Sequence, residues 1–81
     1  MLKYIVIPHN DFEFMITFPD IIGHDHFVDA CLDINIDKEN IISAGFINKD
    51  LECYCGSHSL NIKSRGKTDT ELFRFNLGIK D

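Results

Sequence analysis

The chain has 81 residues, of which 44% are hydrophobic, and a formal net charge of −5. This length allows one domain, residues 1–81, near the lower size limit for a self-sufficient core. A hydrophobic content this high, with seven Phe residues, excludes the intrinsically disordered class. The acidic balance argues against broad binding to nucleic acids or anionic membranes, because both attract proteins with a positive field.

The cysteine pattern indicates a reducing compartment. Cys31, Cys53 and Cys55 are odd in number, and two of them are separated by one residue, unlike a secreted disulfide framework. The N-terminal apolar run is too short for a signal peptide, and no stretch approaches the ~20 apolar residues of a membrane span. We therefore expect free thiols and a cytoplasmic protein.

The N-terminal segment predicts an antiparallel hairpin. Residues 3–7 are rich in β-branched and aromatic types, and residues 8–11 have the composition of a turn. In residues 12–18, Phe and Ile alternate with other residues at the period of a strand, which places three Phe side chains on one face. Pro19 is expected to end this second strand.

The next segment is helical by its spacing. Residues 24–32 carry apolar side chains at helical intervals, namely Phe27, Val28, Cys31 and Leu32. A rival interpretation starts a strand near Cys31, because Leu32, Ile34 and Ile36 alternate with polar residues. We favour the helix over residues 24–32 and an irregular connection over residues 33–40.

The rest of the chain predicts two or three short strands and a helix. Residues 41–47 form a strand in which Gly45 marks a bulge or a close backbone approach, and residues 48–50 form a turn. A strand over 51–55, a break at 56–57 and a short strand over 58–62 follow, before a basic loop over 63–67. Thr68 and Glu71 have the spacing of a capping box, and Gly78 with Ile79 can end the helix.

Together these elements predict an α+β fold. Their order is β-β-α-β-β-(β)-α, in which the strand at 58–62 is the fifth and optional strand. A single antiparallel sheet of four or five strands, with two helices packed on one face, buries this pattern most simply.

The loop before the last helix is a candidate anion contact. Gly66-Lys67-Thr68 matches the tail of a phosphate-binding loop, but the first Gly of that motif is replaced by Asn61, which argues against nucleotide hydrolysis. Free backbone N–H groups at a helix start still attract anions. The candidate residues for this contact are Ser64, Arg65, Lys67 and Thr68.

Three groups of residues partly match metal sites. Residues 33–37 match the start of a calcium loop, but Lys38 and Ala44 stand where that loop needs Gly and Glu. His24 and His26 would share a face only on a strand. Cys53, Cys55 and His58 bring soft ligands close in sequence, yet their spacing misses the usual zinc pattern. If residues 51–55 form a strand, Cys53 and Cys55 face the same side, where the simplest interpretation is small apolar filling of the core.

A pattern over residues 41–77 resembles a group of bacterial proteins. The residues that carry the resemblance are Ile42-Ser43-Ala44-Gly45-Phe46, Cys53-Tyr54, Ser59-Leu60 and Ser64-Arg65. In these positions the chain resembles short uncharacterised proteins of the accessory gene pool, of the kind found in integron cassettes and prophages. The resemblance implies a small cytosolic protein with no assigned activity, and it carries over no functional residue.

The sequence has no recognisable arrangement of nucleophile, base and orienting group, so we expect neither enzyme activity nor a cofactor. The leading hypothesis is a non-enzymatic module that binds a protein partner, or a second copy of itself, through a sheet edge or a helix face. One alternative is a metal- or small-ligand-binding protein. Another is an acidic inhibitor of a nucleic-acid-handling enzyme, encoded by a mobile element, whose carboxylates occupy a phosphate-binding groove.

Overall fold

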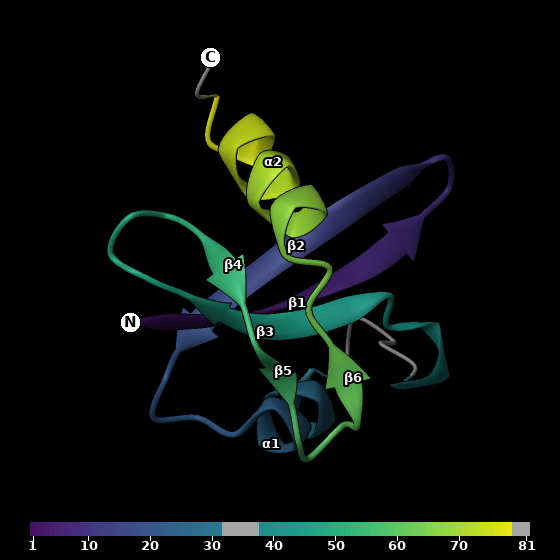
Figure 1. Ribbon diagram of the computed structural model, residues 1–81. Coiled ribbons are helices and arrows are strands. Elements are labelled where there is room, and N and C mark those ends of the chain that lie inside the picture. The colour runs from purple at the N-terminus through teal and green to yellow at the C-terminus, as the bar shows by residue number, and fades with distance from the viewer. Residues whose placement is uncertain (32–37, 79–81) are drawn as a thin grey trace.

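The computed structural model describes residues 1–31 and 38–78. It confirms an α+β fold built from a four-stranded antiparallel sheet and two helices (Figure 1). The elements are β1 (Leu2–His9), β2 (Phe12–Pro19), α1 (His24–Ala30), the 3-10 helix η2 (Lys38–Asn40), β3 (Ser43–Ile47), β4 (Cys53–Tyr54), β5 (Gly56–Ser57), β6 (Ile62–Lys63) and α2 (Lys67–Asn76). The main sheet has the order β2-β1-β3-β4, and β5 pairs with β6 in a separate ribbon.

The predicted N-terminal hairpin is confirmed. β1 and β2 pair along their whole length, from Leu2 opposite Pro19 to His9 opposite Phe12. The turn has two residues, and Asn10 takes the left-handed conformation that such turns require (φ 55°). The alternation of Phe and Ile in β2 therefore fixed both its period and its register.

The two helices pack on opposite faces of the sheet, so the prediction that they share one face is wrong. β1 lies in the middle of the sheet, and its residues Tyr4, Ile5 and Val6 are all fully buried. Because successive side chains of a strand point to opposite faces, three buried neighbours need cover on both sides. In Figure 1, α2 lies above the sheet and α1 below it.

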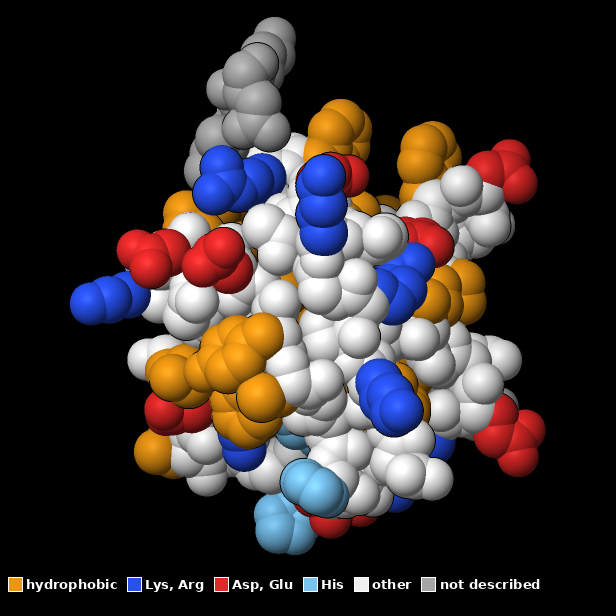
Figure 2. Space-filling view, viewed as in Figure 1, with side chains coloured by type: hydrophobic (Ala, Val, Ile, Leu, Met, Phe, Trp, Pro, Cys, Tyr) orange, Lys and Arg blue, Asp and Glu red, His pale blue; other side chains and the backbone are white. Residues whose placement is uncertain are grey.

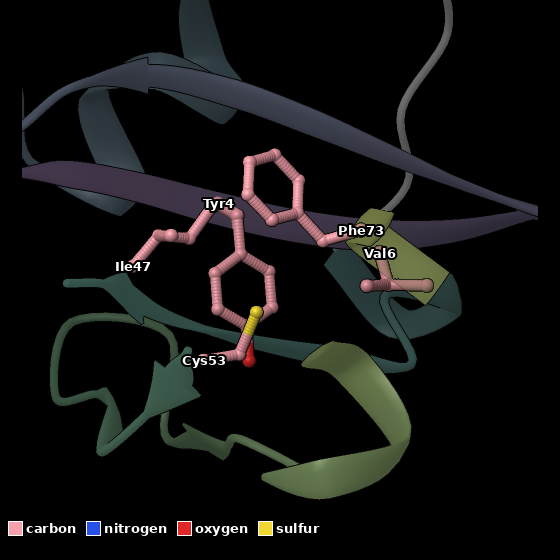
Figure 3. Packing of buried hydrophobic residues seen from close by; sticks show 5 residues of the cluster. All are labelled: Tyr4, Val6, Ile47, Cys53 and Phe73. Carbon is pink, nitrogen blue, oxygen red and sulfur yellow. The ribbon is translucent and has the colours of Figure 1, made fainter. Parts of the chain in front are cut away.

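The core accordingly has two parts. On the α2 side, Figure 3 shows the ring of Tyr4 pointing toward Cys53, with Ile47 and Phe73 beside it. On the α1 side, the buried residues of the cluster are Ile5, Phe18, Val28, Ile41 and Ala44. The side chains of Phe18 and Phe27 stack there with ring centroids 4.1 Å apart, which holds α1 against β2.

The predicted strand over 51–55 is shorter and ends differently. β4 contains only Cys53 and Tyr54, and Cys55 has a left-handed backbone (φ 66°) that turns the chain out of the strand. The predicted break at 56–57 is the strand β5, and the predicted strand over 58–62 is mostly the turn that joins β5 to β6. A short ribbon has replaced the expected fifth strand of the main sheet.

The helix ends also differ from the prediction. α1 ends at Ala30, with Cys31 as its C-cap. α2 starts at Lys67 with Gly66 as the N-cap and no side-chain cap, so the predicted capping box at Thr68 and Glu71 is wrong. The predicted stop at Gly78 is confirmed, since α2 ends at Asn76 and Gly78 has φ 78°.

Some predictions concern residues that the structure does not describe. These are Leu32 at the expected end of the first helix, the calcium-like residues 33–37, and Ile79 after the last helix. In the described segments, no helix has the length and apolar character needed to cross a bilayer.

Gly45 is predicted to be intolerant of a side chain. A Cβ at this position would lie 2.4 Å from the backbone oxygen of Tyr54, which cannot move without breaking the β3–β4 pairing. We expect Gly45→Ala to reduce the free energy of unfolding by about 2 kcal/mol, measured by urea unfolding. Gly23→Ala is the matched control, because the one close contact of its Cβ, at 2.9 Å, is the end of the flexible Asp25 side chain, and the His26 ring lies at an ordinary contact distance. Equal stability losses in the two variants would contradict this explanation of Gly45.

Candidate functional site

A fully buried carboxylate, Asp69, joins α2 to the sheet. Its oxygens accept hydrogen bonds from the Tyr4 hydroxyl at 2.6 Å and from the Ser43 hydroxyl at 3.0 Å. The backbone N–H of Arg65 donates at 2.9 Å, and Nε of the same residue donates at 2.7 Å. These four donors come from β1, β3 and the loop before α2, so one charged group connects three parts of the fold.

The network extends from Asp69 to the surface of β2. The Ser64 hydroxyl lies 2.6 Å from the Tyr4 hydroxyl and accepts a hydrogen bond from the Gly66 N–H. The outer nitrogens of Arg65 donate to both carboxylate oxygens of Glu13, at 2.8 and 3.3 Å. The Arg65 guanidinium thus lies between two carboxylates, one buried and one exposed.

The ionisation of this network follows from its hydrogen bonds. Burial acts to raise the pKa of Asp69, but the bonds from Tyr4, Ser43 and Arg65 outweigh it and hold that pKa below its ordinary value. Burial and the neighbouring carboxylate raise the pKa of the Tyr4 phenol. Burial also raises the pKa of Cys53 to about 11. At neutral pH the network therefore holds the buried Asp69 anion and the neutral Tyr4 phenol, and the Cys53 thiol packed in the same core is neutral.

The predicted anion contact divides into two parts. Ser64 and Arg65 are engaged within the chain, where Asp69 and Glu13 supply the carboxylates. Lys67 and Thr68 lie exposed in the first turn of α2. The contact with an external anion stays a prediction for that turn.

The predicted soft ligands separate in space, contrary to the expectation that Cys53 and Cys55 face the same side. Cys53 is buried in the α2-side core, whereas the left-handed Cys55 is exposed. Cys55 and His58 line a shallow pocket of about 430 Å³ between β3 and the β5–β6 ribbon, with Phe46 and Ile62 among its walls. This pocket holds one thiol and one imidazole.

The paired histidines also diverge. His24 is 4% exposed, and its Nε2 lies 3.0 Å from the backbone oxygen of Gly45. His26 points into solvent beside Asp25. Over residues 1–31 and 38–78, no group of three or more His, Cys, Asp or Glu side chains is placed to hold a metal ion.

Strand β2 forms an edge of the main sheet. Its outer side has no strand partner within the described segments. The two-residue turn closes on the pair His9–Phe12, so the backbone groups of even-numbered β2 residues face β1. Val6, opposite Met15, supports this pattern, since its carbonyl accepts a bond from Ile42 on the β3 side. The backbone groups of Glu13, Met15 and Thr17 therefore point outward.

This edge carries few of the features that usually protect a sheet edge, and its one Pro, Pro19, lies at the very end of the strand. Such edges are shortened, charged, bulged or interrupted by Pro. β2 runs for eight residues, and its single charged side chain, Glu13, is paired with Arg65. On the face of β2 turned toward α1, Phe12 is 71% exposed and Phe14 is 46% exposed. The opposite edge strand, β4, has only two residues. The outer side of β2, with Phe12 and Phe14, is the candidate functional site and is called the β2 edge below.

The comparisons with known proteins give no family for this chain. No protein-family model, curated protein or solved structure matches it. The resemblance to accessory-gene proteins therefore stays a hypothesis.

Sequence reasoning missed the two features that organise the site. The sequence patterns did not single out Asp69, although its position three residues after Gly66 suits a side chain that caps the helix start. The strand at 12–18 was predicted, but its edge position was not. Phe12 and Phe14 are exposed, whereas Phe18 on the same face is buried. The one sequence signal for this difference is that Phe12 and Phe14 lie nearer to the hairpin turn.

Asp69→Asn is expected to destabilise the fold. In either orientation the amide would place its NH2 group against two donors, Tyr4 O–H with Arg65 N–H or Ser43 O–H with Arg65 Nε–H, and the buried charge paired with Arg65 would be lost. We expect a loss of about 2–4 kcal/mol in the free energy of unfolding by urea titration at pH 7. Glu71→Gln, on the exposed side of the same helix, is the control and should change stability by less than about 0.5 kcal/mol. Similar losses in both variants would refute the role of Asp69.

His24 is expected to make stability depend on pH. Burial lowers its pKa below the ordinary 6.5, with Lys3 acting in the same direction and Asp25 opposing it. The folded chain then binds fewer protons than the unfolded chain, so this stabilisation is complete above about pH 6.5 and is lost as the pH falls through the lowered pKa. The urea concentration at the unfolding midpoint should therefore decrease as the pH is lowered from about 7.5 to about 5.5.

The histidine variants identify the group responsible. His24→Gln should remove most of this pH dependence, whereas His26→Gln, at an exposed position, should retain it. A urea midpoint of the unchanged protein that stays constant from about pH 7.5 to about pH 5.5 would contradict the prediction.

Proposed function

We propose that this protein is a non-enzymatic interaction module that binds a macromolecular partner at the β2 edge. The observation that carries the proposal is an eight-residue edge strand with no partner on its outer side in the described segments. Strand addition at such an edge satisfies backbone groups that otherwise bond only water.

The side chains at this edge favour the same mode of binding. In strand addition, backbone hydrogen bonds supply affinity and alternate side chains supply specificity. Phe12 and Phe14 project from one face, where they are available to a partner. Aromatic residues of this kind dominate the energy of many interfaces, because they bury a large apolar area.

The distribution of polar groups supports a binding role over a catalytic one. Asp69, Tyr4 and Ser43 form a buried network whose members bond one another. Cys55 and His58 in the shallow pocket are both exposed, which differs from a nucleophile and a base that a third group holds within hydrogen-bond reach. On the face seen in Figure 2, basic side chains lie among acidic ones, which is less suited to an acidic mimic of nucleic acid than a single acidic area would be.

We also propose that the module acts in the cytoplasm. The three cysteines Cys31, Cys53 and Cys55 are free. An exposed thiol such as that of Cys55 persists unmodified most readily in a reducing compartment.

The test removes one outward hydrogen-bond donor from the β2 edge. Thr17→Pro eliminates the outward N–H and leaves the pairing with β1 intact, because even-numbered residues make those bonds. Thr17→Ala keeps the N–H and serves as the control. Each tagged variant is used to capture proteins from the native host. We expect Thr17→Pro to retain at most about a tenth of the partner that the unchanged protein and Thr17→Ala capture. Equal capture by all three would refute the proposed site.

A further inference from the structure

We infer that the strand added at the β2 edge is β2 of a second copy of this chain, in antiparallel register about Met15. This inference rests on the proposed function, since it names the partner of the same edge. It joins two four-stranded sheets into one continuous sheet across a twofold axis.

The outward backbone groups are arranged symmetrically along β2. They belong to Glu13, Met15 and Thr17, and Met15 is the middle one. A twofold axis at Met15 places it opposite its own copy and places Glu13 opposite Thr17 of the second copy. Every outward residue then meets an outward residue. With the axis at Phe14, Thr17 would lie opposite a turn residue of the second copy. With the axis at Ile16, Glu13 would lie opposite Pro19 of the second copy, which has no N–H.

The same register brings apolar side chains together on the face turned toward α1. Phe14 of one copy lies opposite Ile16 of the other, and Phe12 lies opposite Phe18. The exposed fractions of Phe12 and Phe14, 71% and 46%, amount to about 230 Å² of aromatic surface per copy. This is the exposed apolar area of β2 that a symmetric partner can cover.

The charge distribution favours the β2 edge for self-association. The chain carries a net charge of −5, so two copies repel each other over most approaches. At the β2 edge, Glu13 is the single charged residue of the strand, and Arg65 holds it in a bidentate ion pair. In the register about Met15, Glu13 faces the neutral Thr17 of the second copy. No like charges are therefore opposed between the paired strands.

The interface is small, which sets the expected affinity. Stable dimers usually bury about 800 Å² per partner. The aromatic area here is well below that figure, even with the backbone of seven paired residues added. We therefore expect a reversible dimer that forms in the micromolar range or above.

The decisive measurement is amide hydrogen exchange by NMR at two protein concentrations, about 10 μM and about 1 mM. In a monomer, the amides of Phe14, Ile16 and Phe18 are protected by β1, whereas those of Glu13, Met15 and Thr17 are open to water. We expect exchange of the odd-numbered amides to slow at least tenfold at the higher concentration, with the even-numbered amides protected at both. Odd-numbered amides that exchange quickly at both concentrations would overturn the inference.

Light scattering over the same range adds a second, independent readout. The mass should rise toward that of a dimer in the unchanged protein and in Thr17→Ala, and should stay that of a monomer in Thr17→Pro. Circular dichroism and a cooperative unfolding transition establish that Thr17→Pro is folded; if it is not, the exchange pattern of the unchanged protein decides. A dimer that persists in folded Thr17→Pro would place the contact elsewhere and refute the register.

The failure of this inference differs from the failure of the proposed function. A strict monomer with fast odd-numbered amides refutes the second copy as partner. If that monomer still captures a host protein in a manner sensitive to Thr17→Pro, strand addition at the β2 edge stands with a different partner. If it captures nothing, both ideas fail together.

Discussion

A carboxylate leaves water only if new donors replace the hydrogen bonds that it loses, and Asp69 is fully buried. Its donors are Tyr4 at the start of β1, Ser43 at the start of β3 and Arg65 beside the start of α2. Residues 4 and 69 lie at opposite ends of the chain, so the network can form only when sheet and helix are both in place. The position of α2 over the sheet, and the α2-side core beneath it, depend on this single charge.

The elements that depend on local pattern could be predicted from the sequence. The alternation in residues 12–18 determined the β1–β2 hairpin, and Gly45 marked a close approach that the Tyr54 carbonyl provides. Gly78 likewise ended the last helix. The opposite placement of the two helices was also encoded, in the continuous apolar run Tyr4-Ile5-Val6. It was missed because a continuous run was interpreted only as a strand, without asking which strand is covered on both faces.

One expectation about the candidate ligands is wrong because the backbone leaves regular strand geometry at Cys55. The prediction that Cys53 and Cys55 share a face requires an extended strand through Cys55, and the left-handed conformation there separates the two sulfurs. Non-glycine residues adopt this conformation rarely, so composition gives no warning of it. Asp69 was not anticipated, for a different reason. Arg65 is only four residues from it, but its partners in the sheet, Tyr4 and Ser43, are 65 and 26 residues away, and contacts this distant leave no periodic signal. In both cases the residues that lie close in space are set by the fold and not by a local sequence pattern.

The openness of β2 follows from the size of the domain. Each face of the central strand β1 needs cover, and the described helices have seven and ten residues. Helices this short span about 10 and 15 Å, which covers part of a sheet whose longest strands have eight residues. α1 holds Phe18 and Phe27 near one end of β2, and the hairpin end with Phe12 and Phe14 extends beyond it. A longer helix would cover these rings and close the site. A chain of 81 residues has little helix with which to cover a sheet on both faces, and this accounts for both the two-part core and the exposed edge.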